Sequence, residues 1–264
     1  KGCDDCEPEV LLDPNEFSKD GTISLGNVSV SPNGKKLAYS ISDGGSDWRT
    51  WKVMDIETKE DQIDAIEWSK FSYATWESDS TGFYYQKYEE PDEALVDVNR
   101  SPELYFHKLS DSQNKDVLIY SDNKNPDWSW SISVPDEGDY RVLSIGEGTD
   151  ERNLIYIKFN KDEDFVPVIK EFKATYYFLG GIKNTLWFSS PRSCEASDAA
   201  SRSSRLISLA IEGYKNFWSK SSATSSIFDI ILRAFSIFPK YILELKALSN
   251  NSKLSELELS ANCE

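Results

Sequence analysis

The sequence predicts an all-β fold, because short stretches rich in aromatic and branched residues alternate with polar turns over most of its length. Between Val28 and Phe188 no segment has the apolar spacing of an amphipathic helix. One cassette, a polar turn followed by a strand, returns three times, and its copies align at Gly34, Ser80 and Gly138. Recurrence at a spacing of roughly 50 residues is typical of four-stranded β-propeller blades. We therefore expect a partial β-propeller of about three to four blades.

The first predicted blade contains two strands on either side of the loop 42–47, whose small polar residues favour a turn. Residues 51–56 then alternate between apolar and polar, as a half-buried strand does, and 57–60 form the next polar turn. The second blade begins near Ser72 and has strands at 82–86, 104–109 and 117–120. A third blade opens near Trp128, and a fourth opens around Thr175.

The tail has a different composition, which predicts a boundary at Phe188. Serine occurs 18 times in 189–264, and aspartate falls from 21 in the part before this boundary to 2 in the part after it. We interpret 1–188 as propeller blades and 189–264 as a divergent, irregular or partly helical tail. The stretch 205–211 still has a strand pattern, whereas apolar residues between Ile227 and Phe238 could share one helical face that ends at Pro239. The tail either belongs to a further blade with a buried or partner-facing helix, or is not native sequence.

Charge and hydropathy exclude two classes of partner. Residues 1–188 carry a net charge of −17 and residues 189–264 a net charge of +1. Nucleic acid is excluded because phosphate binding needs a concentrated basic face. A membrane span is excluded because no uninterrupted apolar run approaches the roughly 20 residues that a membrane-spanning helix needs.

The four cysteines are too few and too scattered to predict a metal site. Cys3 and Cys6 have the spacing of half a zinc site or of a redox pair, but no second close pair or nearby histidine completes a ligand set. The acidic neighbours of this pair also disfavour the thiolate form. We expect no metal and no cofactor, and the low cysteine content favours a cytoplasmic location. Because the first residue is Lys1 and the only methionine is Met54, we also expect an incomplete sequence.

From Glu9 to about Phe188 the chain resembles the N-terminal propeller region of the prolyl oligopeptidase family of serine peptidases. The phrases that carry the resemblance are LLDPN (11–15), DGT (20–22), SDGGSDW (42–48), KVMDIET (52–58), EWSKFS (67–72), GFYY (82–85), LYFH (104–107), DVL (116–118) and IGEGTD (145–150). Their order and spacing, more than any single phrase, mark the similarity.

The resemblance implies cleavage of short peptides after proline, by a Ser–Asp–His triad on a separate α/β-hydrolase domain. That chemistry needs a serine on a sharp elbow, usually written G-x-S-x-G, and no such motif occurs here. The only histidine, His107, lies in the middle of a predicted strand, where we expect a structural role. We therefore expect no catalytic residue in this chain and no activity from the chain alone.

In the family the propeller limits access to a cavity shared with the hydrolase domain, and one propeller aromatic lines the substrate pocket. Tyr84, or its neighbour Phe83, best matches that position, although both could simply pack within the blade. The predicted function is thus the substrate-gating part of a peptidase that acts on short proline-containing peptides. The alternative is a non-catalytic propeller scaffold that binds a protein or peptide partner.

Overall fold

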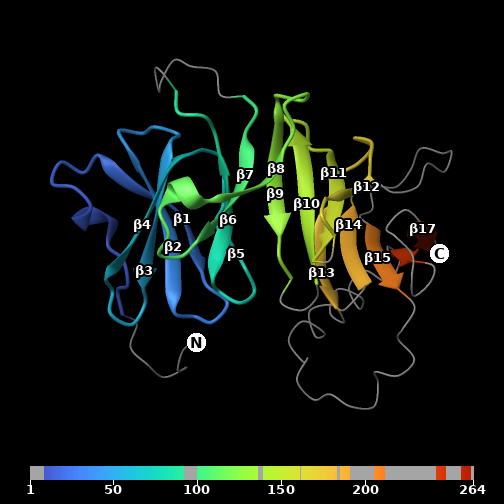
Figure 1. Ribbon diagram of the computed structural model, residues 1–264, viewed down its shortest axis with the longest axis horizontal. Helices are drawn as coiled ribbons and strands as arrows, with labels where there is room; N and C mark the ends of the chain where they lie inside the picture. Colours follow the sequence, from blue (N-terminus) through green and yellow to red (C-terminus); the bar gives the residue numbers. More distant parts are fainter. Residues whose placement is uncertain are drawn as a thin grey trace, which may run out of the picture. The chain divides into compact units, whose positions relative to one another are not determined.

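Short antiparallel strands make up nearly all of the regular structure in the computed structural model (Figure 1). The structure describes residues 9–91, 100–135, 139–160, 162–182 and 185–190, together with the backbone of three further strands between 205 and 262. Two short 3₁₀ turns, η1 (Pro14–Glu16) and η2 (Gln113–Lys115), are the only helical elements in these residues. The predicted all-β class is therefore confirmed.

The first blade is a four-stranded antiparallel sheet in chain order. Its strands are β1 (Ile23–Val30), β2 (Lys36–Asp43), β3 (Arg49–Asp55) and β4 (Asp61–Ser69). The predicted loop at 42–47 overlaps the connection between β2 and β3, although Ser42 and Asp43 still belong to β2. The polar turn at 57–60 connects β3 to β4. Along most of β4 the side chains alternate, with Ile63 exposed and Asp64 and Ile66 buried, as expected for a strand with one covered face.

The second blade repeats this arrangement. Its strands are β5 (Thr75–Trp76), β6 (Gly82–Lys87), β7 (Glu103–Lys108) and β8 (Val117–Ser121). β6 is buried along nearly its whole length because β5 and β7 flank it in the sheet and aromatic side chains cover its faces. One pairing between Ser69 of β4 and Lys87 of β6 joins the two blades into a single hydrogen-bonded sheet.

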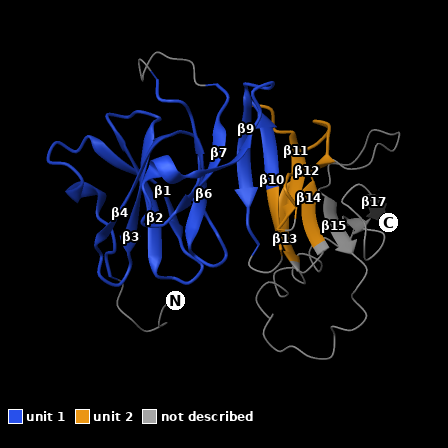
Figure 2. Cartoon of the chain, in the orientation of Figure 1, with its two compact units in different colours: residues 1–136, 143–148 blue, residues 137–142, 149–264 orange. Residues whose placement is uncertain are grey.

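The third blade is a separate four-stranded sheet in the order β12-β11-β10-β9. Its strands are β9 (Trp128–Ser133), β10 (Tyr140–Glu147), β11 (Asn153–Phe159) and β12 (Val166–Ile169). The chain divides into two compact units, residues 1–136 with 143–148 and residues 137–142 with 149–264, so the division falls within β10 (Figure 2). The predicted third blade is confirmed in number of strands and in position.

The remaining strands form a five-stranded sheet in chain order. They are β13 (Tyr177–Ile182), β14 (Thr185–Ser190), β15 (Arg205–Ile211), β16 (Ile242–Ala247) and β17 (Leu257–Asn262). The predicted strand at 205–211 is β15. Neither β16 nor β17 was predicted. β16 pairs in parallel with β15, whereas the other pairings of this sheet are antiparallel. The helix expected between Ile227 and Phe238 lies outside the described residues.

The aligned turn positions of the cassette share one backbone conformation. Gly34 and Ser80 have φ values of 72° and 63°, in the left-handed region that glycine adopts without steric cost. Gly138 lies outside the described residues. The two turns are also in contact, since the amide of Asn33 donates to Ser80 Oγ at 3.1 Å and the indole of Trp76 donates to the carbonyl of Ser29 at 3.0 Å. The repeat is therefore a repeat of backbone geometry as well as of sequence.

Apolar side chains from the first two blades form one buried cluster. It comprises Ala38, Trp51, Val53, Ile66, Ala74, Trp76, Phe83 and Tyr85. A smaller cluster on β2 and β3, formed by Leu37, Tyr39 and Met54, is covered by Leu11, Leu12 and Phe17 of the N-terminal segment. In the second unit Tyr140, Val142, Ile155, Ile157, Leu186 and Phe188 form a third cluster.

Replacing Gly34 with alanine should lower the free energy of unfolding by about 1 kcal/mol, because a Cβ is unfavourable at this left-handed φ. No atom lies within 4 Å of that Cβ, so the loss would report the backbone conformation alone. Denaturant unfolding would measure it. The matched control is Gly146→Ala in β10, whose Cβ would meet only Ser129 Oγ at 3.5 Å. It should keep the free energy of unfolding or raise it by about 0.5–1 kcal/mol, because glycine within a strand is less favourable than alanine. Equal losses in the two variants would contradict the prediction.

The hydroxyl of Tyr140 is buried and has no hydrogen-bond partner among the described residues. The variant Tyr140→Phe should therefore leave the free energy of unfolding unchanged or raise it by up to about 1 kcal/mol, because burying an unpaired hydroxyl costs its desolvation energy. In the control Tyr39→Phe, removal of a hydroxyl that donates to Asp61 at 2.8 Å should cost about 1 kcal/mol. A larger loss in Tyr140→Phe than in Tyr39→Phe would show that Tyr140 has a partner.

Candidate functional site

The structure places Phe83, the first pocket candidate, inside the blade. Its side chain is 0% exposed and belongs to the cluster shared by the first two blades. The ring meets Trp76 edge-on at a centroid distance of 5.3 Å and also contacts Trp51 and Tyr85. Edge-to-face packing of this kind favours a single side-chain position.

Tyr84, the second candidate, is 7% exposed and lies on the opposite face of β6, since successive side chains alternate along a strand. Its hydroxyl donates to Glu77 Oε2 at 2.8 Å, and its ring packs against Phe106 at 5.0 Å. Because the two candidates point to opposite faces, no more than one of them can line a given pocket. The pocket role of either residue stays a prediction.

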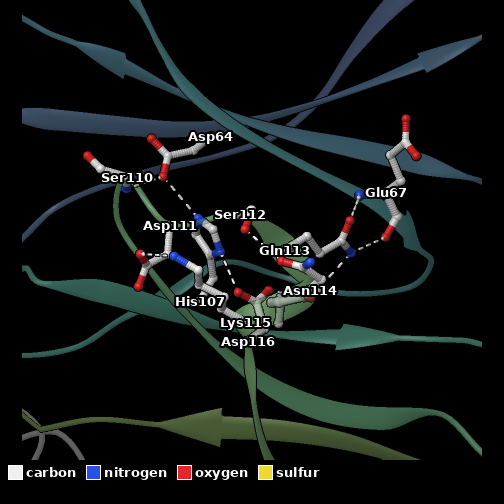
Figure 3. Close-up of polar contacts among 11 residues, drawn as sticks. Asp64, Glu67, His107, Ser110, Asp111, Ser112, Gln113, Asn114, Lys115 and Asp116 are labelled. Atoms are coloured by element: carbon white, nitrogen blue, oxygen red, sulfur yellow. Dashed lines mark hydrogen bonds and ion pairs between the residues drawn. The ribbon is translucent and has the colours of Figure 1, made fainter.

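A buried polar cluster surrounds His107 in the first unit (Figure 3). The ring nitrogen Nδ1 lies 2.7 Å from Asp116 Oδ1, and Nε2 lies 2.9 Å from Asp64 Oδ1. The side chains of His107, Asp64 and Asp116 are 0%, 1% and 2% exposed. The three residues come from different elements, β7, β4 and the residue before β8.

Neighbouring groups complete this cluster. The amide of Ser110 donates to Asp64 Oδ1 at 2.6 Å, and the hydroxyl of Tyr85 donates to Asp116 Oδ2 at 2.8 Å. Asp64 Oδ2 is buried and has no partner among the described residues. The amide side chain of Gln113 in η2 exchanges two hydrogen bonds with the backbone of Glu67 in β4, at 3.1 and 3.0 Å. These contacts bind the loop between β7 and β8 to the first blade.

The carboxylates set the ionisation of the ring. Burial lowers the pKa of His107, but the hydrogen bonds to Asp116 and Asp64 and the charges of both residues outweigh burial and raise the pKa to about 9. Burial raises the pKa of Asp64, and the contacts with His107 and the Ser110 amide outweigh it, so the net pKa is lowered. Burial and the charge of Asp116 raise the pKa of Tyr85.

This arrangement is unsuited to general-base catalysis. Both ring nitrogens are engaged by carboxylates, so neither can accept a proton from a serine hydroxyl. His107 lies within β7, as the predicted strand required, but it is the penultimate residue of that strand and does not lie in its middle. Sequence reasoning did not identify Asp64 and Asp116 as its partners. The available signal was an aspartate at an inward-facing position of β4, between the outward-facing Ile63 and Ala65.

A second polar network centres on Gln86 of β6. Its amide NH₂ donates to the carbonyl of Lys70 at 3.2 Å, and its side-chain oxygen accepts from the amide of Trp130 at 2.9 Å. Its own carbonyl accepts from Ser69 Oγ, which in turn accepts from the indole of Trp51 at 3.1 Å. Through these bonds Gln86 of β6 is connected to β4 by Ser69, to β3 by way of Ser69 and Trp51, and to β9 by Trp130, all within the first unit.

The part of the chain that the structure describes holds no group of three or more His, Cys, Asp or Glu side chains that could bind a metal ion. Cys3 and Cys6, weighed above as half of a zinc site, lie outside it. Among the same described residues, no helix is both long enough and apolar enough to cross a membrane.

Four-stranded antiparallel blades joined in sequence define the chain as a β-propeller protein. The family model for the N-terminal β-propeller domain of prolyl oligopeptidase matches residues 2–198. The chain belongs to the prolyl oligopeptidase family through this propeller domain.

Curated relatives agree with this assignment. A prolyl endopeptidase of Elizabethkingia meningoseptica is 40% identical over 169 residues, which cover 63% of this chain and 24% of the relative. A prolyl endopeptidase of Elizabethkingia miricola is 38% identical over 182 residues, which cover 68% of this chain and 26% of the relative. A dual function macrocyclase-peptidase of Amanita bisporigera is 32% identical over 190 residues, which cover 65% of this chain and 26% of the relative. The chain spans about a quarter of the length of the curated relatives that it matches.

Solved structures give the same result at the level of the fold. A prolyl endopeptidase structure superimposes with a TM-score of 0.61 at 30% identity, over 69% of this chain and 26% of that one. Prolyl oligopeptidase B of Galerina marginata, bound to a 35mer hydrolysis and macrocyclization substrate, superimposes with a TM-score of 0.63 at 26% identity, over 67% and 27%.

Truncation of Phe83 to alanine should lower the free energy of unfolding by about 3–5 kcal/mol, because it leaves a cavity in a fully buried aromatic cluster. The control Phe71→Ala removes the same side chain from a site that is 69% exposed, where Lys70 lies 5.4 Å from the ring. That loss should stay below about 1 kcal/mol. Similar values in the two variants would contradict the buried position of Phe83.

Proposed function

We propose that this chain is the substrate-gating propeller portion of a prolyl-oligopeptidase-like serine endopeptidase that cleaves short peptides after proline. The observation that carries the proposal is the family membership of a chain whose described strands form successive four-stranded blades. Gating needs a rigid wall, and the interlocked aromatic cluster of the first two blades supplies one. The names of the relatives, prolyl endopeptidases and prolyl oligopeptidases, support the choice of substrate.

These 264 residues are proposed to be inactive by themselves. The sequence contains no G-x-S-x-G elbow, and its single histidine is held between two carboxylates. Hydrolysis would then depend on a hydrolase domain that supplies the serine, its base and the oxyanion hole. The cytoplasm is the proposed location, because four cysteines in 264 residues are few compared with the disulfide-rich chains of oxidising compartments.

Tyr84 remains the better of the two proposed pocket residues. Phe83 is enclosed by aromatic rings from both of the first two blades, whereas Tyr84 lies on the other face of β6 with a polar hydroxyl. We also propose that the propeller region ends near Phe188, where the composition changes, and that 189–264 is a divergent tail.

Purified chain should show no hydrolysis of a fluorogenic Gly-Pro peptide and no labelling by a fluorophosphonate probe, which reacts with activated serines. A chimaera in which residues 9–188 replace the aligned quarter of the Elizabethkingia meningoseptica relative should hydrolyse the same peptide, because the borrowed domain supplies the triad. The relative with its propeller deleted serves as the control for gating, since it should lose the preference for short over long peptides.

Turnover by the purified chain would overturn the inactive-alone proposal. A folded chimaera that cleaves long and short peptides alike would overturn the gating role. Peptide binding by the chain without any active chimaera would favour the scaffold alternative.

A further inference from the structure

Three buried charged side chains meet where the first blade contacts the second. Asp64 belongs to β4 of the first blade, whereas His107 and Asp116 belong to β7 and to the residue before β8 of the second. All three are at most 2% exposed, so the interaction takes place away from solvent. Figure 3 shows the two carboxylates on either side of the His107 ring. Its ionisation state therefore affects how the two blades hold together, independently of the proposed function.

The number of protons on the ring follows from the geometry. A neutral imidazole carries one N–H, but both ring nitrogens of His107 lie within 2.9 Å of a carboxylate oxygen. With a neutral ring, one bare nitrogen would face a carboxylate oxygen and neither atom could donate. Protonating Asp64 instead is disfavoured, because its Oδ1 already accepts from the Ser110 amide. The imidazolium satisfies both contacts as a donor while both carboxylates remain acceptors.

We propose that His107 is a charged clasp at neutral pH, an imidazolium whose two N–H groups bind the first blade to the second through Asp64 and Asp116, and that loss of its proton releases this contact at alkaline pH.

Other titratable groups lie on the elements that pack around the ring. From β6, the Tyr85 hydroxyl reaches Asp116 and the Phe83 ring lies 5.5 Å from the imidazole. From β7, the Tyr105 hydroxyl donates to Glu103 at 2.6 Å. From the loop before β8, Lys115 pairs with Asp111 at 3.5 Å on the surface, where the two side chains are 65% and 36% exposed. Among the described residues, the charged groups that face the ring itself are the two carboxylates.

The sign of the pH dependence follows from the direction of each change. The pKa of His107 is raised from its ordinary value of 6.5 to about 9, so its stabilisation is complete below 6.5 and is lost as the pH rises through 9. The pKa of Asp64 is lowered, so its contribution is present above its ordinary value of 3.8 and is lost at more acid pH. Above pH 9 two buried carboxylates would share no cation, and mutual repulsion would open the contact.

Because the chain has a single histidine, ¹⁵N labelling of histidine gives one set of ring signals and tests the proposal directly. Both ring nitrogens should have the chemical shifts of protonated nitrogen from pH 6 to pH 8, with a titration midpoint near 9. A neutral tautomer at pH 7, with one bare nitrogen, would overturn the proposal. This measurement needs no variant and decides the question even if every substitution prevents folding.

Two variants identify the source of the effect. Asp64→Asn and Asp116→Asn should each move the His107 midpoint to lower pH by about 1–3 pH units, because each removes one adjacent negative charge. Asp61→Asn is the matched control: it makes the same change on β4, at a carboxylate that contacts Tyr39 and Lys52 instead. It should leave the midpoint unchanged. An unchanged midpoint in both clasp variants, or an equal change in the control, would overturn the assignment.

The effect on folding is measured by comparing the chain with His107→Gln. Between pH 6.5 and 9 the folding equilibrium constant of the chain should fall on the order of 10²-fold more than that of the variant. Exchange of the Ser110 amide, which donates to Asp64, should accelerate over the same range once corrected for intrinsic exchange. Parallel pH profiles for the chain and the variant would show that proton loss from His107 does not release the contact.

Discussion

Stacking of blade on blade is the interaction on which the rest of the first unit depends. A single four-stranded sheet cannot bury both of its faces, so each blade needs a neighbour. Here Trp51 from the first blade and Trp76 and Phe83 from the second fill that interface with aromatic rings in contact. Aromatic side chains bury large areas with little loss of side-chain freedom, which suits an interface between two rigid sheets.

Polar groups are buried within this apolar interface, and they give it a unique register. Apolar packing tolerates small slips between sheets, but hydrogen bonds between buried groups do not, because each broken bond leaves a desolvated atom. Ser69 of the first blade donates through its hydroxyl to the carbonyl of Gln86 in the second, and the side chain of Gln86 bonds to the carbonyl of Lys70 and the amide of Trp130. Apolar packing therefore holds the blades in contact, and the buried hydrogen bonds fix the position of one blade along the other.

Much of this organisation could be predicted from the sequence, because strands and turns leave local signals. The alternation at 51–56 and the aligned Gly34 and Ser80 predicted the strands and turns that the structure contains. The alternation of β4 indicates that Asp64 faces inward, but its pairing with His107 could not be predicted, because the two residues lie far apart in the sequence and only the stacking of blades brings them together. Strand β16 was missed for a similar reason, since its parallel pairing with β15 depends on a distant segment.

The contact between successive turns restricts where the chain can change length. The amide of Asn33 bonds to Ser80 of the next copy, so an inserted residue in either turn would separate two repeats as well as alter one hairpin. Insertions and deletions are then expected in the connections between strands that make no such contact with the next blade. Here the step from Ser80 to Gly138 is longer than the step from Gly34 to Ser80, and it includes the residues between β6 and β7, at 88–102. Evolution of propellers built this way is expected to lengthen one rim of the blades while the other rim keeps a constant spacing.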